Sequence, residues 1–308
     1  MELWQLRQRQ SLPLEVKIVM SHLRIRKWYE YWNGDVYVSF SGGKDSTVLL
    51  HLVRELYPWV PAVFVDTGLE YPEIREFVKT VNNVVWLWPE MTFLKVIEAK
   101  GFPVISKRVS QSLREIQCPT ERNKALVRLR LTGIRSNGKF SSYSKIPNKW
   151  QYLRHAPFKI SEKCCDIIKK KPMDMYVRET ERQPYIGTMA ADGANRKLEY
   201  LLHGCNAFNH KRPKSTPLSF WTEADIWEYI HTRNLPYSRI YDMGYTRTGC
   251  MFCMFGVHLE KSLNRFERMK HTHPKQWEYC MFKLGLAEVL DYIGVPWGAQ
   301  MEIADYIS

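Results

Sequence analysis

The sequence lacks any long apolar run. No stretch of 18 or more apolar residues occurs among its 308 residues, and the first ten, MELWQLRQRQ, lack the continuous apolar core of a signal peptide. We therefore expect a cytoplasmic protein with no membrane partner. Internal repeats and low-complexity tracts are also lacking, which argues against a solenoid. The chain is 45% apolar and 25% charged, close to globular averages, so we expect it to fold.

Acidic residues are scarce in one segment. Residues 106–171 contain 17 Lys and Arg but only 4 Asp and Glu, whereas the whole chain carries +13, so the remainder is close to neutral. Such a basic patch favours a polyanionic partner, and we predict a nucleic acid. A solvated basic face and a funnel for a small anionic nucleotide are the alternatives. Trp150, Tyr152 and Phe158 lie within the patch as candidates for base stacking, with ordinary core packing as the other interpretation.

Cysteines are few but clustered. In a reducing cytosol, clustered thiols indicate metal ligands or catalysts before disulfides. An adjacent pair, Cys164-Cys165, is followed by Cys250-x-x-Cys253. Adjacent cysteines point both thiolates at one tetrahedral ion only with strain, whereas a cuboidal cluster with separate iron corners accepts them more readily. We predict a 4Fe-4S cluster, with zinc and free buried thiols as alternatives.

Three cysteines fall outside this pattern, namely Cys118, Cys205 and Cys280. Each is more often a small buried residue than a nucleophile. Cys205, in the sequence Leu-His-Gly-Cys, is the candidate that we single out as a sulfur carrier.

Apolar strands alternate with helices in the first third of the chain. Strands are expected over residues 35–40, 60–65 and 84–88, and helices over 44–57 and 72–81. This alternation predicts an α/β fold with a doubly wound, mostly parallel, Rossmann-like sheet whose ligand site lies at the carboxyl ends of the strands.

Three regions follow from the pattern. We expect an N-terminal helix within 1–32, a nucleotide-binding domain over 33–256 that carries the basic insertion, and a mainly helical extension over 257–308. Residues 183–189 are expected to form a further strand. Residues 222–232 are expected to form a helix with Thr222 as N-cap and Asp225 completing a capping box. Residues 132–149 indicate an exposed loop.

A glycine-rich loop, SGGKDST over 41–47, follows the first expected strand and opens a helix. Its backbone amides, the helix N-terminus and Lys44 can converge on phosphate oxygens, so the loop predicts an anion cradle. It is not a Walker loop, because the earlier glycine of GxxxxGK[ST] is missing.

The loop resembles the SGGKDS loop of the PP-loop ATP pyrophosphatases, the adenine nucleotide alpha-hydrolase group that cleaves ATP between the alpha and beta phosphates. The segment DTGLEYPE over 66–73 resembles the DTG…YPE segment of sulfonucleotide reductases and ATP sulfurylase small subunits. The four cysteines resemble the 4Fe-4S set of adenylyl-sulfate reductases. Together with later matches, the resemblance covers residues 33 to 256 and implies the fold of the phosphoadenosine phosphosulfate (PAPS)/adenylyl-sulfate reductase family.

The resemblance implies roles for individual residues. Catalytic roles, including the positioning of Mg²⁺, fall to Lys44, Asp45 and Asp66. The cluster would be held by Cys164, Cys165, Cys250 and Cys253. The residues implied to bind ATP or a related adenine nucleotide are Ser39, Ser41, Gly42, Gly43, Lys44, Asp45, Ser46, Asp66, Thr67, Gly68, Gly187 and Arg196.

Three departures qualify the resemblance. Reductases use a cysteine in a C-terminal Glu-Cys-Gly motif, whereas the last cysteine here is Cys280. The loop has the full Gly-Lys-Asp-Ser form of relatives that consume ATP. Met189-Ala-Ala-Asp192 stands where relatives place an arginine beside the substrate.

We therefore predict an ATP-cleaving, cluster-dependent enzyme that adenylates, or transfers sulfur to, a nucleic acid, with a sulfur donor such as a cysteine desulfurase. PP-loop tRNA thiolases and the sulfurtransferase-like member of DNA phosphorothioation are similar in kind. A reductase of adenylyl sulfate or its phosphorylated form is the first alternative. A non-catalytic nucleotide-binding or nucleic-acid-binding accessory protein is the second.

Overall fold

Two compact units make up the protein in a computed structural model that describes residues 1–261 and 263–298. The first unit combines residues 1–66, 70–88 and 172–248, and the second combines 67–69, 89–171 and the chain from 249 onward. No helix within the described ranges is long and apolar enough to cross a membrane.

The first unit contains the main sheet. Its strands are β1 (Val36–Ser39), β2 (Ala62–Val65), β3 (Val84–Leu87), β5 (Gln183–Ile186), β6 (Asn206–Ala207) and β7 (Lys214–Ser215). Its helices are α1 (Leu3–Gln10), α2 (Leu14–Tyr31), α3 (Lys44–Leu56), α4 (Pro72–Lys79), α8 (Lys171–Thr180), α9 (Ala194–His203) and α10 (Glu223–Thr232). Short 3₁₀ turns lie at Ala190–Asp192 and Arg239–Tyr241.

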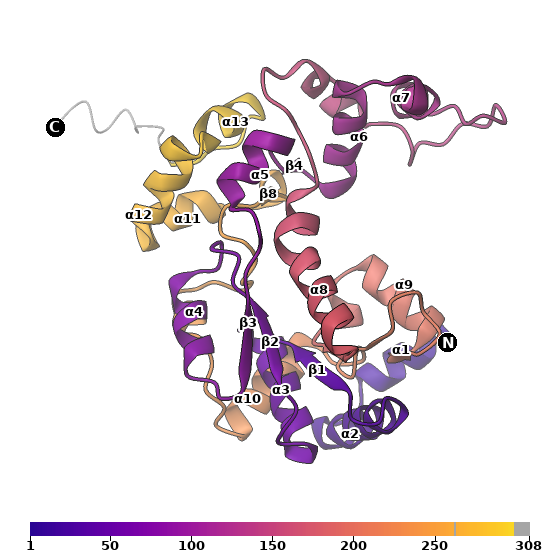
Figure 1. Cartoon of the computed structure of the whole chain (residues 1–308), viewed down its shortest axis with the longest axis vertical. Coiled ribbons are helices and arrows are strands. Elements are labelled where there is room, and N and C mark those ends of the chain that lie inside the picture. The colour runs from indigo at the N-terminus through magenta and orange to yellow at the C-terminus, as the bar shows by residue number, and fades with distance from the viewer. Residues whose placement is uncertain (262, 299–308) are drawn as a thin grey trace. The chain divides into compact units, whose positions relative to one another are not determined.

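The sheet is mostly parallel, as the sequence predicts. Its strand order is β3-β2-β1-β5-β7-β6, and among the described strands of this sheet only β6 and β7 pair antiparallel. Figure 1 shows β3, β2 and β1 as neighbouring strands. The three expected N-terminal strands and the strand after residue 183 are present, each shorter than expected. Because β1 lies between β2 and β5, the carboxyl ends of two neighbouring strands meet beside the loop that follows β1.

Helices cover both faces of this sheet. Side chains along β1 alternate between the faces, so Tyr37 packs with Val63 against Tyr176 of α8, while Val36 and Val38 are fully buried on the opposite face. Helix α3 lies against β1 and β5. The doubly wound α/β class is therefore confirmed.

A buried ion pair joins α2 to α10. The ammonium of Lys17 donates to both carboxylate oxygens of Asp225, at 2.8 and 2.7 Å, and to the carbonyl of Gln10 at 2.7 Å. Asp225 also accepts from the backbone and side chain of Thr222, which confirms the capping box expected at the start of this helix.

Replacing Lys17 by methionine is expected to destabilise the first unit by about 3–5 kcal/mol, because Asp225 would be left as an uncompensated buried charge. Urea unfolding followed by circular dichroism measures the loss. Arg26→Met, at an exposed position on the same helix, is the matched control and should change stability by less than about 0.5 kcal/mol. Equal stability of Lys17→Met and the parent protein would contradict the expectation.

The second unit is mainly helical. It contains β4 (Val104–Ile105) and β8 (Met254–Phe255), which pair in parallel. Its helices are α5 (Phe93–Lys100), α6 (Lys107–Gln117), α7 (Lys124–Thr132), α11 (Arg265–Thr272), α12 (Pro274–Glu278) and α13 (Leu286–Tyr292). Short segments of 3₁₀ or π-helix lie at Glu121–Asn123, Asn148–His155, Asp166–Lys170, Val257–Leu259 and Tyr279–Lys283. The helical C-terminal part expected from the sequence is confirmed within the described residues.

Candidate functional site

The glycine-rich loop turns sharply between β1 and α3. Gly42 has a φ of +71°, and a Cβ built there would lie 2.8 Å from side-chain carbons of Ile74 and Val78. A Cβ on Gly43 would lie 2.8 Å from the hydroxyl oxygen of Thr248. Only glycine fits at Gly42 without strain, because a left-handed backbone and close packing coincide there. The chain therefore reaches the N-terminus of α3 through a tight, buried turn.

Hydroxyl groups hold the loop in shape. Ser46 donates to the carbonyl of Gly43 at 2.9 Å and accepts from the amide of Ser41 at 3.2 Å, and Thr47 also donates to Gly43 at 3.1 Å. The hydroxyls of Ser41 and Ser46 are 3.1 Å apart. These bonds fix the positions of the first amides of α3, where the helix dipole favours a bound anion.

Lys44, the cation of the loop, is buried, with 6% exposure. Its ammonium lies 3.3 Å from Asp45 and 3.3 Å from Glu223 of α10. Burial lowers the pKa of Lys44, but Asp45, Tyr241 and Glu223 together outweigh burial and raise it. Lys44 therefore keeps its charge at neutral pH.

Two residues beside Lys44 were not predicted from the sequence. Glu223 is the first residue of α10, and Tyr241 accepts a 2.8 Å hydrogen bond from the amide of Lys44 through its hydroxyl. Both lie in segments that resemble the family, but the sequence assigned them no role. Nothing local in a sequence indicates which distant residue meets a helix N-terminus.

A second strand end meets the loop. Gly187, just after β5, lies against the start of α3, since a Cβ on it would be 3.0 Å from the carbonyl oxygen of Asp45. Burial raises the pKa of Asp45; Lys44 lowers it, and the nearby Asp192 and Glu223 raise it further. Asp192 is in turn paired with Arg196 of α9. The structure thus brings Asp45, Gly187 and the Asp192–Arg196 pair together, as expected for Asp45 and Gly187 at neighbouring strand ends.

Asp66 is engaged by a neighbouring cation. It follows β2 directly, is 5% exposed, and accepts two hydrogen bonds from Arg75 of α4, at 3.1 and 2.7 Å. The sequence did not predict this partner. Thr67 and Gly68, which we also assigned to the nucleotide, belong to the second unit together with Leu69.

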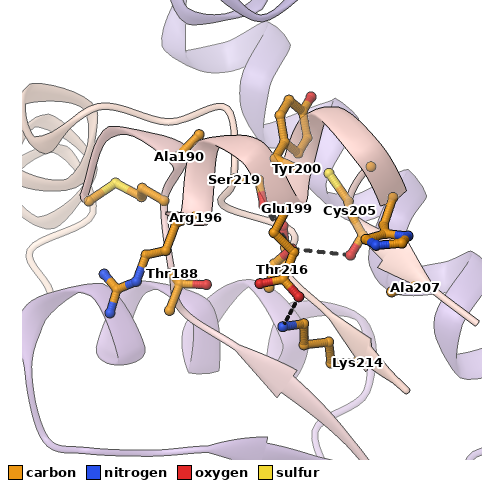
Figure 2. A pocket seen from close by; sticks show the side chains of 13 residues that line it. Thr188, Ala190, Arg196, Glu199, Tyr200, Cys205, Ala207, Lys214, Thr216 and Ser219 are labelled. Carbon is orange, nitrogen blue, oxygen red and sulfur yellow. Dashed lines mark hydrogen bonds and ion pairs between the residues drawn. The ribbon is translucent and has the colours of Figure 1, made fainter. Parts of the chain in front are cut away.

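A pocket lies beneath α9 in the first unit. Figure 2 shows Thr188 and Arg196 at one end of it and Cys205 with Ala207 at the other. Lys214 forms an ion pair with Glu199 across the pocket at 2.5 Å. The arginine end continues toward Asp192 and the loop, so this part of the pocket is a candidate for holding substrate atoms beyond the phosphates.

Cys205 is poorly suited to the sulfur-carrier role for which we singled it out. It is 6% exposed, and burial raises the pKa of its thiol to about 12. At pH 8 such a thiol is ionised in only about one molecule in ten thousand, against about one in four for an ordinary cysteine. The thiolate is the nucleophile, so Cys205 is inert in the folded protein.

Alkylation tests this directly. With iodoacetamide at pH 8, the exposed Cys118 is expected to react more than about 1,000 times faster than Cys205, because burial both raises the pKa of the Cys205 thiol and restricts access to its sulfur. Peptide mass spectrometry measures the two rates, and unfolding in urea should make them similar. Labelling of Cys205 as fast as Cys118 in the folded protein would restore it as a carrier.

The four cysteines of the predicted cluster belong to the second unit. Cys164 and Cys165 immediately precede the π-helical turn Asp166–Lys170, and their sulfurs are 4.0 Å apart. Cys250 and Cys253 form a turn closed by a 3.1 Å bond between the amide of Cys253 and the carbonyl of Cys250. This turn leads into β8, whose pairing with β4 fixes its place.

The two cysteine pairs lie close enough to affect each other's pKa values. The pKa of Cys164 is raised by its hydrogen bond to Cys165, by burial and by the nearby Cys165, Cys253 and Cys250. Burial raises the pKa of Cys253 to about 11, and Cys250 and Cys165 contribute. The thiol of Cys164 therefore lies within electrostatic range of the other three thiols, and that of Cys253 within range of Cys165 and Cys250.

Cations surround this group of thiols. The pKa of Cys165 is lowered, first by its hydrogen bond to Cys164 and then by Lys107 and Lys169. Arg265 acts in the same direction on Cys253 and donates to its carbonyl at 3.0 Å. Positive charge stabilises thiolates, which are the form that binds metal.

The donor set is compatible with more than one metal. Thiolates around one tetrahedral zinc at about 2.3 Å lie about 3.8 Å apart, and the sulfurs of Cys164 and Cys165 are separated by a similar distance. No group of three or more His, Cys, Asp or Glu side chains in the described residues is close enough to hold one metal ion. Four thiolates are also the ligands that a cuboidal iron-sulfur cluster uses.

Comparison with known proteins places the chain in a family. Residues 35–100 and 102–255 match the model of the phosphoadenosine phosphosulfate reductase domain. An uncharacterized protein of Methanocaldococcus jannaschii is 24% identical over 260 residues, which cover 82% of this chain but only 42% of that protein. The chain thus spans less than half the length of this relative.

Two further proteins have named activities. The adenosine 5′-phosphosulfate reductase of Bacillus cytotoxicus is 24% identical over 237 residues, or 76% of this chain and 80% of the reductase. A crystal structure of the PAPS reductase of Candida auris in a phosphate complex covers 78% of this chain and 96% of its own, at 14% identity and a TM-score of 0.43. On the extent of the domain match, and in agreement with the PP-loop resemblance, this chain belongs to the phosphoadenosine phosphosulfate reductase family.

Proposed function

We propose that the protein is an enzyme that cleaves ATP between its alpha and beta phosphates and uses the activated product in sulfur transfer to a nucleic acid. The observation that carries the proposal is Lys44, a buried cation at the N-terminus of α3, held beside Asp45 and Glu223 by a complete Ser-Gly-Gly-Lys-Asp-Ser loop. A loop of this form provides what the leaving of pyrophosphate requires, namely fixed amide donors and a positive charge.

The residues of the loop have separate roles in the proposed reaction. In the proposed reaction an oxygen of the acceptor attacks the alpha phosphorus, the bond between alpha phosphorus and bridging oxygen breaks, and pyrophosphate leaves with the bonding electrons. Lys44 and the N-terminus of α3 stabilise the charge on pyrophosphate. A sulfur nucleophile then displaces AMP from the adenylated acceptor. Within the first unit, the proposed nucleotide site also includes Ser39, Asp66, Gly187 and Arg196. Thr67 and Gly68, which belong to the second unit, keep the nucleotide-binding role that the sequence suggested as a proposal of their own.

Asp45 is the proposed protein ligand of Mg²⁺. Magnesium in nucleotide sites is held by one or two carboxylates together with phosphate oxygens, so a preformed cage of three carboxylates is not required. Asp192 and Glu223 already act electrostatically on Asp45. Asp66, our other candidate, lies in an ion pair with Arg75, so its proposed contribution is to orient the loop after β2 rather than to bind the metal alone.

Cys164, Cys165, Cys250 and Cys253 are proposed to hold a 4Fe-4S cluster. When bound, such a cluster supplies an iron site that can carry a labile sulfide. Lys107, Lys169 and Arg265 would balance the negative charge of the four thiolates. The basic segment over 106–171 is proposed to bind the nucleic acid, and a cysteine desulfurase is the proposed source of sulfur.

Labelled ATP tests the first step. Protein purified without oxygen is incubated with ATP labelled in the alpha phosphate, with and without total cellular RNA or DNA. Release of AMP and pyrophosphate, increased by one of the nucleic acids, is the expected result. No AMP or pyrophosphate release under any of these conditions would remove the activation step.

A second candidate is reduction of adenylyl sulfate. The match to the Bacillus cytotoxicus reductase over 80% of that enzyme favours it, whereas the ATP-consuming form of the loop and Met189 in place of an arginine favour the first. Incubation with adenylyl sulfate or its 3′-phosphorylated form and a thiol donor separates the two. Sulfite release from either nucleotide, without ATP cleavage, would assign reduction.

A further inference from the structure

A short hairpin follows α7 in the basic segment. The amide of Arg135 donates to the carbonyl of Lys139 at 3.0 Å, the amide of Ser141 donates to Gly133 at 2.8 Å, and Ile134 and Phe140 form an antiparallel bridge. Residues 133–141, expected from the sequence to lie in a loop, are therefore an ordered hairpin. In Figure 1 the chain after α7 extends away from α6 and α7.

Two aromatic rings are presented on and beside this hairpin. Phe140 is 65% exposed and Tyr143 is 76% exposed, and the guanidinium of Arg108 lies 4.9 Å from the centre of the Tyr143 ring. Gly133 makes room for Phe140, because a Cβ there would lie 2.7 Å from its ring. Exposed rings beside cations, held on an ordered turn, are suited to stacking on the flat faces of bases.

The aromatic residues that we had named from the sequence make ring contacts without being fully buried. Trp150 lies edge-on against His258 at 5.1 Å, and Tyr152 and Phe158 both contact Tyr292, with ring centres 5.8 and 5.4 Å apart. Trp150 and Phe158 are half-buried and Tyr152 is 43% exposed, so base stacking and packing both stay predictions for them. The sequence could not separate the two groups, since both lie among lysines and arginines.

Charges in the segment also fall into two groups. Carboxylates pair with six of the cations, namely Arg114, Lys124, Arg130, Lys163, Lys170 and Lys171. By contrast, no ion pair with a carboxylate occurs in the described residues for the half-buried Arg108 or for the exposed cations Arg122, Arg128, Arg135, Lys139 and Lys149. Of the second group, Arg135 and Lys139 lie on the hairpin itself, and Arg108 lies against the ring of Tyr143.

We propose that the hairpin surface, defined as Arg108, Arg135, Lys139, Phe140 and Tyr143, binds single-stranded nucleic acid. Cations that lack carboxylate partners can neutralise phosphates, which releases the counterions condensed on the nucleic acid. Exposed rings can stack on bases. A duplex offers phosphates but hides the faces of its bases, so only unpaired bases use both features. The inference rests on the proposed function, in which a nucleic acid is the acceptor. It adds which residues bind that nucleic acid and that its bases are unpaired.

Fluorescence anisotropy with the full-length protein tests the proposal. The probes are labelled 12-nucleotide oligouridylate, oligodeoxythymidylate and a 12-base-pair RNA duplex. Both single strands are expected to bind more tightly than the duplex, and the tighter of the two identifies RNA or DNA as the source. Combining Phe140→Ala with Tyr143→Ala should weaken single-strand binding by about tenfold or more. Arg135→Gln with Lys139→Gln should reduce the slope of log Kd against log salt by about 0.7 for each phosphate that the variant no longer neutralises.

Matched variants keep the test decisive. Phe282, a 60% exposed ring near the C-terminal helices, is replaced by alanine as the control and should leave Kd unchanged. All the substituted side chains except the guanidinium of Arg135 lack side-chain hydrogen-bond partners in the described residues, and circular dichroism verifies folding. Equal or tighter duplex binding, or an unchanged Kd in the double aromatic variant, would overturn the proposal. Failure of ATP cleavage with intact strand binding would instead count against the proposed function alone.

Discussion

Lys44→Ala is expected to abolish cleavage of ATP, lowering kcat by at least about 1,000-fold, because a single preorganised donor to developing negative charge contributes about 100- to 1,000-fold and Lys44 also carries a full charge. The substitution removes the buried cation that Asp45 and Glu223 hold at the N-terminus of α3. Steady-state release of AMP and pyrophosphate from labelled ATP, measured without oxygen, gives kcat for the variant and the parent protein.

The control for this variant lies on the same unit. Lys79→Ala removes an exposed lysine at the end of α4 and is expected to leave kcat and KM unchanged. Lys44→Arg should also lose most activity, because a planar guanidinium does not fit a site shaped for a compact ammonium. A Lys44→Ala protein that retains more than about a tenth of the parent rate would remove Lys44 from the reaction.

Lys44→Ala also separates two sites. Because the hairpin surface and Lys44 belong to different units, the variant should bind a single strand with the parent Kd although it cleaves no ATP. Loss of both activities together, in a protein that remains folded, would contradict the independence of the two sites.

Replacing any of the four clustered cysteines by serine is expected to remove the iron-sulfur cluster. Protein prepared without oxygen should contain about four iron and four sulfide per chain and absorb visible light, whereas Cys164→Ser, Cys165→Ser, Cys250→Ser and Cys253→Ser should each fall below about one iron. The physical reason is that thiolates bind iron far more strongly than hydroxyls do. Iron and sulfide analysis with visible absorption provides the measurement.

Cys118→Ser is the matched control for the cluster. Cys118 is an exposed cysteine of the same unit, so its replacement should leave iron content and colour unchanged. Colourless parent protein with one zinc per chain would show that the four thiols hold zinc. Full iron content in all four serine variants would show that iron binds elsewhere.

Short-range sequence patterns were enough to predict most of the fold. The strand before residue 41, the turn at Gly42 and the helix from Lys44 onward were predictable because turn glycines, buried strands and helix starts depend on neighbouring residues. The capping box of Thr222 and Asp225 followed for the same reason. Strand lengths were less well predicted, because the ends of a strand depend on where its neighbours stop pairing.

The proposals that four cysteines hold a cluster and that Lys44 is the cation of the loop came likewise from the sequence, since spacing and residue type limit what chemistry a motif can perform. Only the tertiary structure decided which groups surround them. Strand β1 lies between β2 and β5, which brings Asp192 to Asp45, and the packing of α10 brings Glu223 to Lys44 from a distant part of the chain. The same is true of burial: folding covered Cys205 and placed Trp150 against His258, but left Phe140 and Tyr143 exposed. Exposure depends on contacts between distant segments, and no local pattern contains that information.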